Sequence, residues 1–157
     1  MNVSGTIPLK TKQTFTPKVT MGKGDKVVSW KSSNKKVVSV GRNGKVKGLK
    51  AGKATVTVTS TKGAKATVKI KVQKQKVATK KLKATVSTKQ ILKKGKKVKL
   101  KVAKTPFTAQ DTVKWTSSNK KIATVTSKGV VKGLKKGTAT ITAKAGKKVV
   151  RFKIKVK

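Results

Sequence analysis

The chain has 157 residues, and its 44 Lys and Arg residues face only two Asp residues, which gives a formal net charge of +42. It contains no Cys, His or Glu, which excludes disulfides and any catalysis that depends on histidine. Aromatic residues make up 3% of the chain, so any core must consist mainly of Val, Ile, Leu and Ala. Such a chain repels itself and attracts polyanions.

The first 20 residues lack the apolar segment of a signal peptide, because Pro, Lys and Thr separate Ile7, Leu9 and Phe15. No apolar run elsewhere approaches the roughly 18 residues that a membrane-spanning helix needs. We therefore expect no membrane span, and no signal peptide is visible in this chain.

The N-terminal part of the chain predicts strands separated by turns. Residues 2–9 are expected to be short and irregular, since Pro8 limits ladder pairing. Residues 14–21 alternate, which predicts a half-buried strand. The glycines of residues 22–25 indicate a turn, and residues 26–31 form the next predicted strand, which carries Trp30.

Strand and turn signals continue to residue 72. Residues 37–40 are a short predicted strand, and Asn43-Gly44 after it is a strong hairpin signal. Residues 54–60 and 65–72 alternate apolar residues with Thr or Lys, as half-buried strands do. No stretch has a convincing helical period, so the predicted class is all-β.

The same pattern occurs a second time. Trp30 and Trp115 lie 85 residues apart, and the same offset pairs Phe15 with Leu100. We therefore predict two tandem domains, at residues 1–73 and 77–157.

At this offset, residues 80–87 of the second copy correspond to a segment that ends at Asn2. The opening strand of the first domain is thus expected to be short or missing. Either this strand is degenerate or lies at a chain boundary, or the first domain has an open sheet edge that accepts a strand from a neighbour.

Both copies contain Trp-x-Ser-Ser-Asn, followed by a Gly-x-Val-x-Gly-Leu segment. This pattern resembles the bacterial immunoglobulin-like domain, group 2. The first copy departs from the pattern at Val38 and Lys53. The resemblance implies two immunoglobulin-like β-sandwiches of about seven strands each. It also implies a spacer or adhesion module in bacterial surface proteins or phage virions, with no catalytic residues.

Few residues of this sequence are suited to catalysis or to binding a metal or a cofactor. Asp25 and Asp111 fall one in each domain, so they predict turn residues that accept backbone N–H groups and not a catalytic pair. Trp30 and Trp115 are read as core residues, with sugar or base stacking as the alternative. We expect no enzyme, no catalytic residue, no metal and no cofactor.

The lysines are the candidate site, because alternation places them on the solvent face of strands. The predicted polyanion-binding residues are Lys69, Lys71, Lys97, Lys99, Lys101, Lys153 and Lys155. The expected partner is an anionic polymer or acidic protein surface, such as a cell-wall polymer, a glycan or a capsid. The expected location is extracellular, at a cell surface or on a virion.

Two alternatives stay open. One is a virion structural or decoration protein that self-assembles through the open edge of the first domain. The other is nucleic-acid binding without sequence preference, because lysine is poorly suited to reading base edges.

Overall fold

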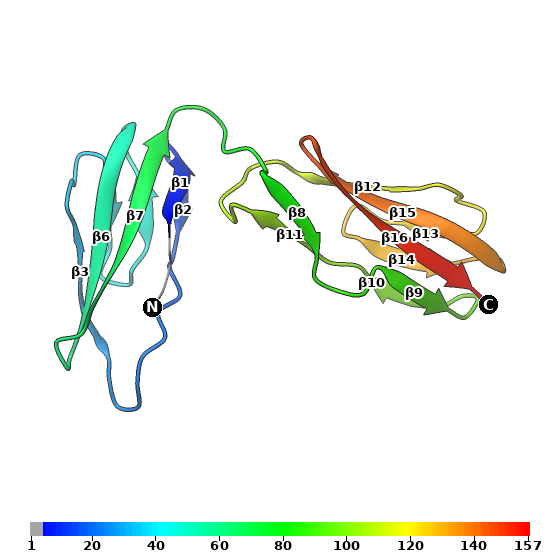
Figure 1. Cartoon of the computed structure of the whole chain (residues 1–157), viewed down its shortest axis with the longest axis horizontal. Coiled ribbons are helices and arrows are strands. Elements are labelled where there is room, and N and C mark those ends of the chain that lie inside the picture. The colour runs from blue at the N-terminus through cyan, green and yellow to red at the C-terminus, as the bar shows by residue number, and fades with distance from the viewer. Residues whose placement is uncertain (1–4) are drawn as a thin grey trace. The chain divides into compact units, whose positions relative to one another are not determined.

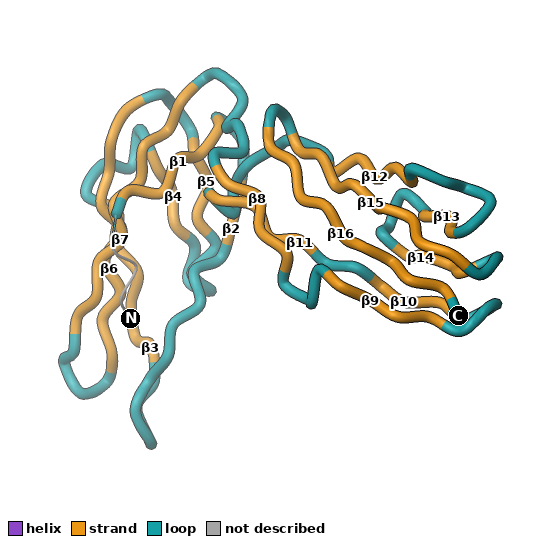
Figure 2. The backbone as a smooth tube through the Cα atoms, turned by 45° about the vertical axis from the view of Figure 1, so that its right-hand side comes forward, coloured by secondary structure: helices purple, strands orange, loops and turns teal. Residues whose placement is uncertain are grey.

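A computed structural model describes residues 5–157, which divide into two units with the boundary between Val77 and Ala78. The described residues form strands and turns and contain no helix, which confirms the predicted all-β class (Figures 1 and 2). Within this range there is accordingly no helix of the length and apolar character that crossing a membrane requires.

Unit 1 contains two sheets. The strand order is β1-β7-β6-β3 in the larger sheet and β2-β5-β4 in the smaller sheet. Neighbouring strands are antiparallel except β1 and β7, which run parallel. The strands are β1 (Thr6–Lys10), β2 (Thr14–Phe15), β3 (Val27–Ser32), β4 (Val38–Val40), β5 (Val46–Gly48), β6 (Gly52–Ser60) and β7 (Lys65–Gln73).

Unit 2 repeats these sheets and adds one strand pair. The larger sheet has the order β12-β15-β16-β9, the smaller sheet has the order β10-β14-β13, and β8 pairs with β11. The strands are β8 (Lys81–Ala84), β9 (Lys89–Leu92), β10 (Lys97–Lys99), β11 (Val102–Thr105), β12 (Val113–Ser117), β13 (Ala123–Val125), β14 (Val130–Gly133), β15 (Gly137–Ala145) and β16 (Lys148–Val156).

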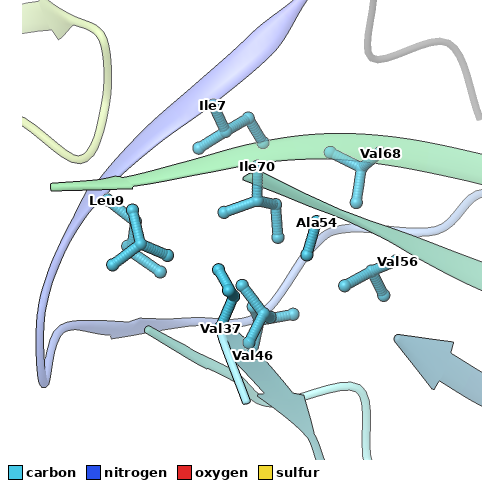
Figure 3. Close-up of a cluster of buried hydrophobic side chains, with 10 residues drawn as sticks. Ile7, Leu9, Val37, Val46, Ala54, Val56, Val68 and Ile70 are labelled. Carbon is cyan, nitrogen blue, oxygen red and sulfur yellow. The ribbon is translucent and has the colours of Figure 1, made fainter. Parts of the chain in front are cut away.

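The core of each unit lies between its sheets. In unit 1 the inward residues of β1 and β7, such as Leu9 and Ile70, point toward Val37 and Val46 on the other side (Figure 3). In unit 2 Phe152 and Ile154 are fully buried at the same place in the sandwich. Because side chains alternate between the two faces of a strand, the residues between these apolar positions point to solvent.

The repeated Ser-Ser-Asn segment is a turn held by its own side chains. The Ser33 hydroxyl accepts a hydrogen bond from the Thr55 N–H at 2.8 Å, and Ser118 accepts the equivalent bond from Thr140 at 2.9 Å. The Asn34 side chain also accepts the N–H of Lys36 two residues on. These polar residues are therefore explained by turn chemistry.

Two sequence-based expectations about the N-terminal part are wrong. Of residues 2–9, which the sequence predicts to be irregular, residues 2–4 lie outside the described residues, and Thr6–Lys10 forms β1. Pro8 is tolerated there since β1 is an edge strand. The predicted strand over residues 14–21 stops at Phe15, and loop follows as far as β3 (Figure 2). In unit 2 the corresponding part of the chain is also divided, between β10 and β11, and β11 pairs with β8, which has no counterpart among residues 5–157.

The predicted pairing of Phe15 with Leu100 is also wrong. Phe15 lies opposite Val46 in β5, whereas Val98 lies opposite Val131 in β14. Since Val46 and Val131 are equivalent, Phe15 corresponds to Val98, and the offset in this part of the chain is 83. Equivalent residues of β2 and β10 are therefore two residues closer in the sequence than Trp30 and Trp115 are.

Each tryptophan lies against a glycine that closes a hairpin. Gly129 has φ +76°, and a Cβ there would lie 2.8 Å from the Trp115 ring. Gly95 has a similar φ of +82°, but a Cβ there would meet nothing within 4 Å. Both positions favour glycine for their backbone, and only Gly129 also needs it for packing.

We predict that Gly129→Ala destabilises unit 2 more than Gly95→Ala does. Both changes carry the left-handed backbone strain of about 1–2 kcal/mol. Gly129→Ala must also displace the Trp115 ring, which adds about 1–3 kcal/mol. Urea unfolding followed by circular dichroism and tryptophan fluorescence measures the difference. Equal losses would mean that the ring does not pack tightly on this glycine.

Candidate polyanion-binding faces

The seven lysines predicted from the sequence fall into three groups, and all are exposed. Lys69 and Lys71 lie on β7, in the larger sheet of unit 1. Lys153 and Lys155 lie on β16, in the larger sheet of unit 2. The third group belongs to the smaller sheet of unit 2, with Lys97 and Lys99 on β10 and Lys101 directly after Leu100. The seven residues therefore do not form one surface.

The outer face of the larger sheet in unit 1 combines lysine with threonine. Lys71 lies opposite Lys53 on β6, and Lys69 lies opposite Thr55. On the other side of β7, Thr6 lies beside Lys69. We call this surface the Lys–Thr face of unit 1, and its members are Lys10, Lys31, Lys53, Lys65, Lys69, Lys71, Thr6, Thr55, Thr57, Thr59 and Thr67.

Unit 2 repeats this face on the equivalent strands. Lys153 lies between Lys89 on β9 and Thr140 on β15. Lys114 on β12 lies opposite Lys144 on β15. The Lys–Thr face of unit 2 comprises Lys89, Lys114, Lys144, Arg151, Lys153, Lys155, Thr116, Thr138, Thr140 and Thr142.

The smaller sheet does not repeat its lysines in this way. In unit 2, Lys97 lies opposite Lys132 on β14. In unit 1, the position equivalent to Lys97 is Thr14, which lies opposite Lys47. The smaller sheet keeps Lys47 and Lys132 at equivalent places. The larger sheet keeps two lysines, because Lys69 and Lys71 correspond to Lys153 and Lys155, with Thr55 and Thr140 beside them. The Lys–Thr faces are therefore the stronger candidate surfaces.

Sequence reasoning missed several members of these faces, including Lys53, Lys89, Lys114 and Arg151. Alternation along each strand shows that such residues point outward, but it does not show which strands are neighbours. The parallel pairing of β9 with β16, which brings Lys89 to Lys153, follows only from the fold.

Cation pairs across strands are electrostatically unfavourable in the free protein. Like charges directly opposite each other destabilise a sheet. Two unit charges about 5 Å apart in water repel by about 0.8 kcal/mol. Anions that bind over Lys53 and Lys71, or over Lys89 and Lys153, would relieve this repulsion.

The two carboxylates do not neutralise these faces, because each is engaged by a loop. Asp111 is buried and its Oδ2 accepts the backbone N–H of Thr79. Asp25 Oδ1 accepts the Thr61 hydroxyl at 2.7 Å and the Lys62 N–H at 3.2 Å. Both aspartates therefore act as loop anchors.

The hydrogen bond from the Thr61 hydroxyl, together with those from backbone N–H groups, holds the pKa of Asp25 below its ordinary value of 3.8. Partial desolvation opposes this shift and is the smaller effect. The ionised form is thus preferred in the folded protein.

The tryptophans are held mainly by their cores, and Trp30 also lines an open surface pocket with Lys31, Ser32 and Lys35. Trp30 and Trp115 are half-buried and pack against the cores of their units. The Trp115 and Phe152 ring centroids lie 5.9 Å apart. Among residues 5–157 there is also no group of three or more His, Cys, Asp or Glu side chains that could hold a metal ion.

Two facing sheets with these strand orders and an apolar core between them define an immunoglobulin-like β-sandwich, and the chain contains two. The sequence pattern of the bacterial Ig-like domain (group 2) matches residues 3–86 and again residues 70–156. The chain belongs to this family, as the resemblance implied.

The similarity to individual proteins extends over smaller parts of this chain or of the other protein. A 3-O-alpha-D-galactosyl-alpha-L-arabinofuranosidase of Bifidobacterium longum subsp. longum is 53% identical over 53 residues, which are 33% of this chain and 5% of that enzyme. The S-layer protein rSbsC is 27% identical over 82% of this chain and 19% of its own, with a TM-score of 0.46. A GH10 xylanase with a bacterial Ig-like domain, from termite gut, is 28% identical over 43% of this chain and 18% of its own, with a TM-score of 0.38.

We predict that salt stabilises this protein. Raising the ionic strength from 0.01 M to 0.15 M shortens the Debye length from about 30 Å to about 8 Å, which screens the repulsion between lysines. Each kcal/mol gained raises the midpoint of thermal unfolding by about 4–8 °C for domains of this size. Calorimetry in a sodium chloride series measures the effect. A midpoint that is constant or falls with salt would contradict it.

A second prediction concerns acid. Because the folded pKa of Asp25 lies below 3.8, its contribution to stability is present above that pH and is lost as the pH falls through the folded value. Asp25→Asn should therefore remove part of the acid sensitivity of unit 1. Urea unfolding of both proteins between neutral pH and strong acid tests this, with Thr61→Val as the companion variant that removes the main donor. Identical pH profiles would show that the carboxylate makes no pH-dependent contribution.

Proposed function

We propose that this chain is a non-catalytic structural or attachment module of a cell envelope, and that its Lys–Thr faces hold an anionic polymer. The observation that carries the proposal is the recurrence of the same cationic face in both units. Lys69 and Lys71 on β7 correspond to Lys153 and Lys155 on β16, all four are exposed, and neither face contains a carboxylate. Surfaces without a binding role usually mix both signs of charge.

The spacing of the faces suits a linear polyanion. Outward residues on one strand are about 6.7 Å apart, and neighbouring strands are about 4.8 Å apart. Ammonium groups at these spacings can each meet a different phosphate or carboxylate along one polymer. The threonine hydroxyls between them, such as Thr55 and Thr140, add neutral donors.

The side chains favour recognition of charge over recognition of bases. Lysine is a flexible point charge, whereas base reading relies on planar bidentate donors. Stacking of bases needs exposed rings, and Trp30 and Trp115 are half-buried against the cores. A phosphate-rich wall polymer of the teichoic-acid type therefore fits better than a specific nucleic-acid sequence.

Family membership supports a modular role. The galactosyl-arabinofuranosidase contains a matching segment that makes up 5% of its length, which is consistent with an accessory module beside other domains. Asp25 and Asp111 both act as loop anchors, which leaves no acid–base pair for catalysis within residues 5–157.

The test is retention on purified Gram-positive cell walls, with and without teichoic acid, compared with duplex DNA in a salt series. We expect retention by teichoic-acid walls near physiological salt and loss of DNA at lower salt. Loss of all ligands at the same salt concentration would contradict a wall-polymer role and leave only a general electrostatic attraction.

We predict that the Lys–Thr face matters more than net charge. One variant carries Lys89→Gln, Lys153→Gln and Lys155→Gln on the Lys–Thr face of unit 2. Its matched control carries Lys97→Gln, Lys99→Gln and Lys132→Gln on the smaller sheet. Both variants lose the same charge, and each breaks one cross-strand lysine pair.

The Lys–Thr variant should bind walls more weakly and give a shallower slope of log affinity against log salt, because fewer counterions are released when fewer anionic groups are neutralised. The control should change both quantities much less. Equal effects of the two variants would mean that binding depends on total charge alone.

A further inference from the structure

An open hollow of about 440 Å³ lies on the Lys–Thr face of unit 1, where β1, β7 and β6 run side by side. Five of its lining residues have polar side chains that point away from the core: Thr6, Ser33, Lys53, Thr55 and Lys69. The other two, Ala54 and Ile70, point into the core (Figure 3). The hollow therefore presents two ammonium groups and three hydroxyls.

The polar groups of the hollow are arranged around Lys69. This residue lies directly between Thr6 on β1 and Thr55 on β6. Lys53 is its diagonal neighbour on β6, at a typical Cα separation of about 7–8 Å, so both flexible side chains can reach one anion. The Ser33 hydroxyl accepts the Thr55 N–H at 2.8 Å, which leaves its own proton for donation to a ligand.

Unit 2 has the same central groups at the equivalent place. Lys153 lies opposite Thr140 on β15, as Lys69 lies opposite Thr55. The Ser118 hydroxyl accepts the Thr140 N–H at 2.9 Å, which is the counterpart of the bond to Ser33 in unit 1. One lysine, one threonine and one serine are thus common to the two sites.

The remaining two positions exchange their residue types between the units. Lys89 on β9 takes the place that Thr6 has on β1. Thr138 on β15 takes the place that Lys53 has on β6. Either exchange alone would change the number of lysines around the site, but together they leave two lysines and three hydroxyls in each unit. Solubility needs only net charge on the surface, and it does not require that one exchange offsets the other.

We propose that each of these sites holds one phosphate group of an anionic polymer. This inference rests on the function proposed above and adds the position and the chemical nature of the bound anion. We call the two sites the phosphate subsites. They comprise Thr6, Ser33, Lys53, Thr55 and Lys69 in unit 1, and Lys89, Ser118, Thr138, Thr140 and Lys153 in unit 2.

The donor set favours a phosphate over a carboxylate. The donors belong to three neighbouring strands and a turn, so they approach the bound group from several directions. A phosphate accepts hydrogen bonds around a tetrahedral centre, whereas a carboxylate accepts them mainly near one plane. Lysine binds phosphate as a point charge without a fixed geometry. The second ammonium group can therefore come from β6 in unit 1 and from β9 in unit 2.

The experiment follows the backbone amides of the intact chain by nuclear magnetic resonance during titration with a short glycerol phosphate oligomer near physiological salt. The first variant, Lys53→Thr, removes one lysine from the subsite of unit 1. The second adds Thr6→Lys, which gives unit 1 the arrangement of unit 2. The third, the matched control, adds Thr59→Lys instead. Thr59 lies on the same face, opposite Lys65, and does not line the hollow.

In the parent chain the amide signals of Thr55 and Thr140 should both shift with the oligomer. Lys53→Thr should weaken binding at Thr55 by about two- to fivefold, as the loss of an exposed ion pair does, and leave binding at Thr140 unchanged. Adding Thr6→Lys should restore the affinity at Thr55, whereas adding Thr59→Lys should not. Because unit 2 is unaltered, its signals control for ligand quality and folding.

Equal restoration by Thr6→Lys and Thr59→Lys would overturn the phosphate subsites, since the charge of the face alone would then account for binding. Absence of a response at Thr55 and Thr140 would also overturn them. Binding of a short polyglutamate as tight as that of the oligomer would overturn the choice of phosphate. Retention of the parent chain on cell walls, measured separately, would in each case leave the proposed function standing, whereas loss of that retention would contradict the function itself.

Discussion

Because side chains alternate between the two faces of each strand, the apolar residues that stabilise this protein and the lysines that repel one another follow each other in the sequence. In β7, Val68, Ile70 and Val72 are buried while Lys69 and Lys71 point to solvent. Inward burial of each valine or isoleucine contributes about 1.5–3 kcal/mol, and each exposed cross-strand lysine pair costs about 1 kcal/mol or less. The core therefore tolerates the charge. A register shift of one residue would bring lysines into the core, so the charge also fixes the register.

The same alternation explains which features the sequence could predict. The tryptophan strands, the Asn43-Gly44 hairpin and the outward lysines follow from local patterns whose physical cause lies within a few residues. The prediction of one strand over residues 14–21 was wrong, because a strand needs a neighbouring strand to pair with as well as alternating side chains. In unit 2 that neighbour is β8, and in unit 1 no strand of residues 5–157 takes its place.

Other features were not readable because they depend on which strands meet. The parallel contacts of β1 with β7 and of β9 with β16 leave no periodic signal in the sequence, yet they bring Thr6 to Lys69 and Lys89 to Lys153. The offset between β2 and β10, which is two residues shorter than elsewhere, was also not visible in the sequence, because the tryptophans and asparagines keep a spacing of 85. Six of the seven predicted lysines thus lie on strands, Lys101 lies between β10 and β11, and the sequence did not group them into surfaces.

The recurrence of the Lys–Thr face is the feature that supports the proposed binding role over a role in solubility alone. Solubility needs net charge anywhere on the surface, whereas a linear polymer needs cations at regular intervals on one face. The smaller sheets show what happens without the second requirement, since Lys97 in unit 2 is replaced by Thr14 at the equivalent place in unit 1. The larger sheets instead keep lysine beside threonine in both units, with Lys69 opposite Thr55 and Lys153 opposite Thr140. The repelling lysine pairs lie at different places, since Lys53 corresponds to Thr138 and Lys89 to Thr6. The lysine row that recurs on β7 and β16 is thus the observation that supports the proposed ligand, and the cross-strand pairs add repulsion that differs between the two units.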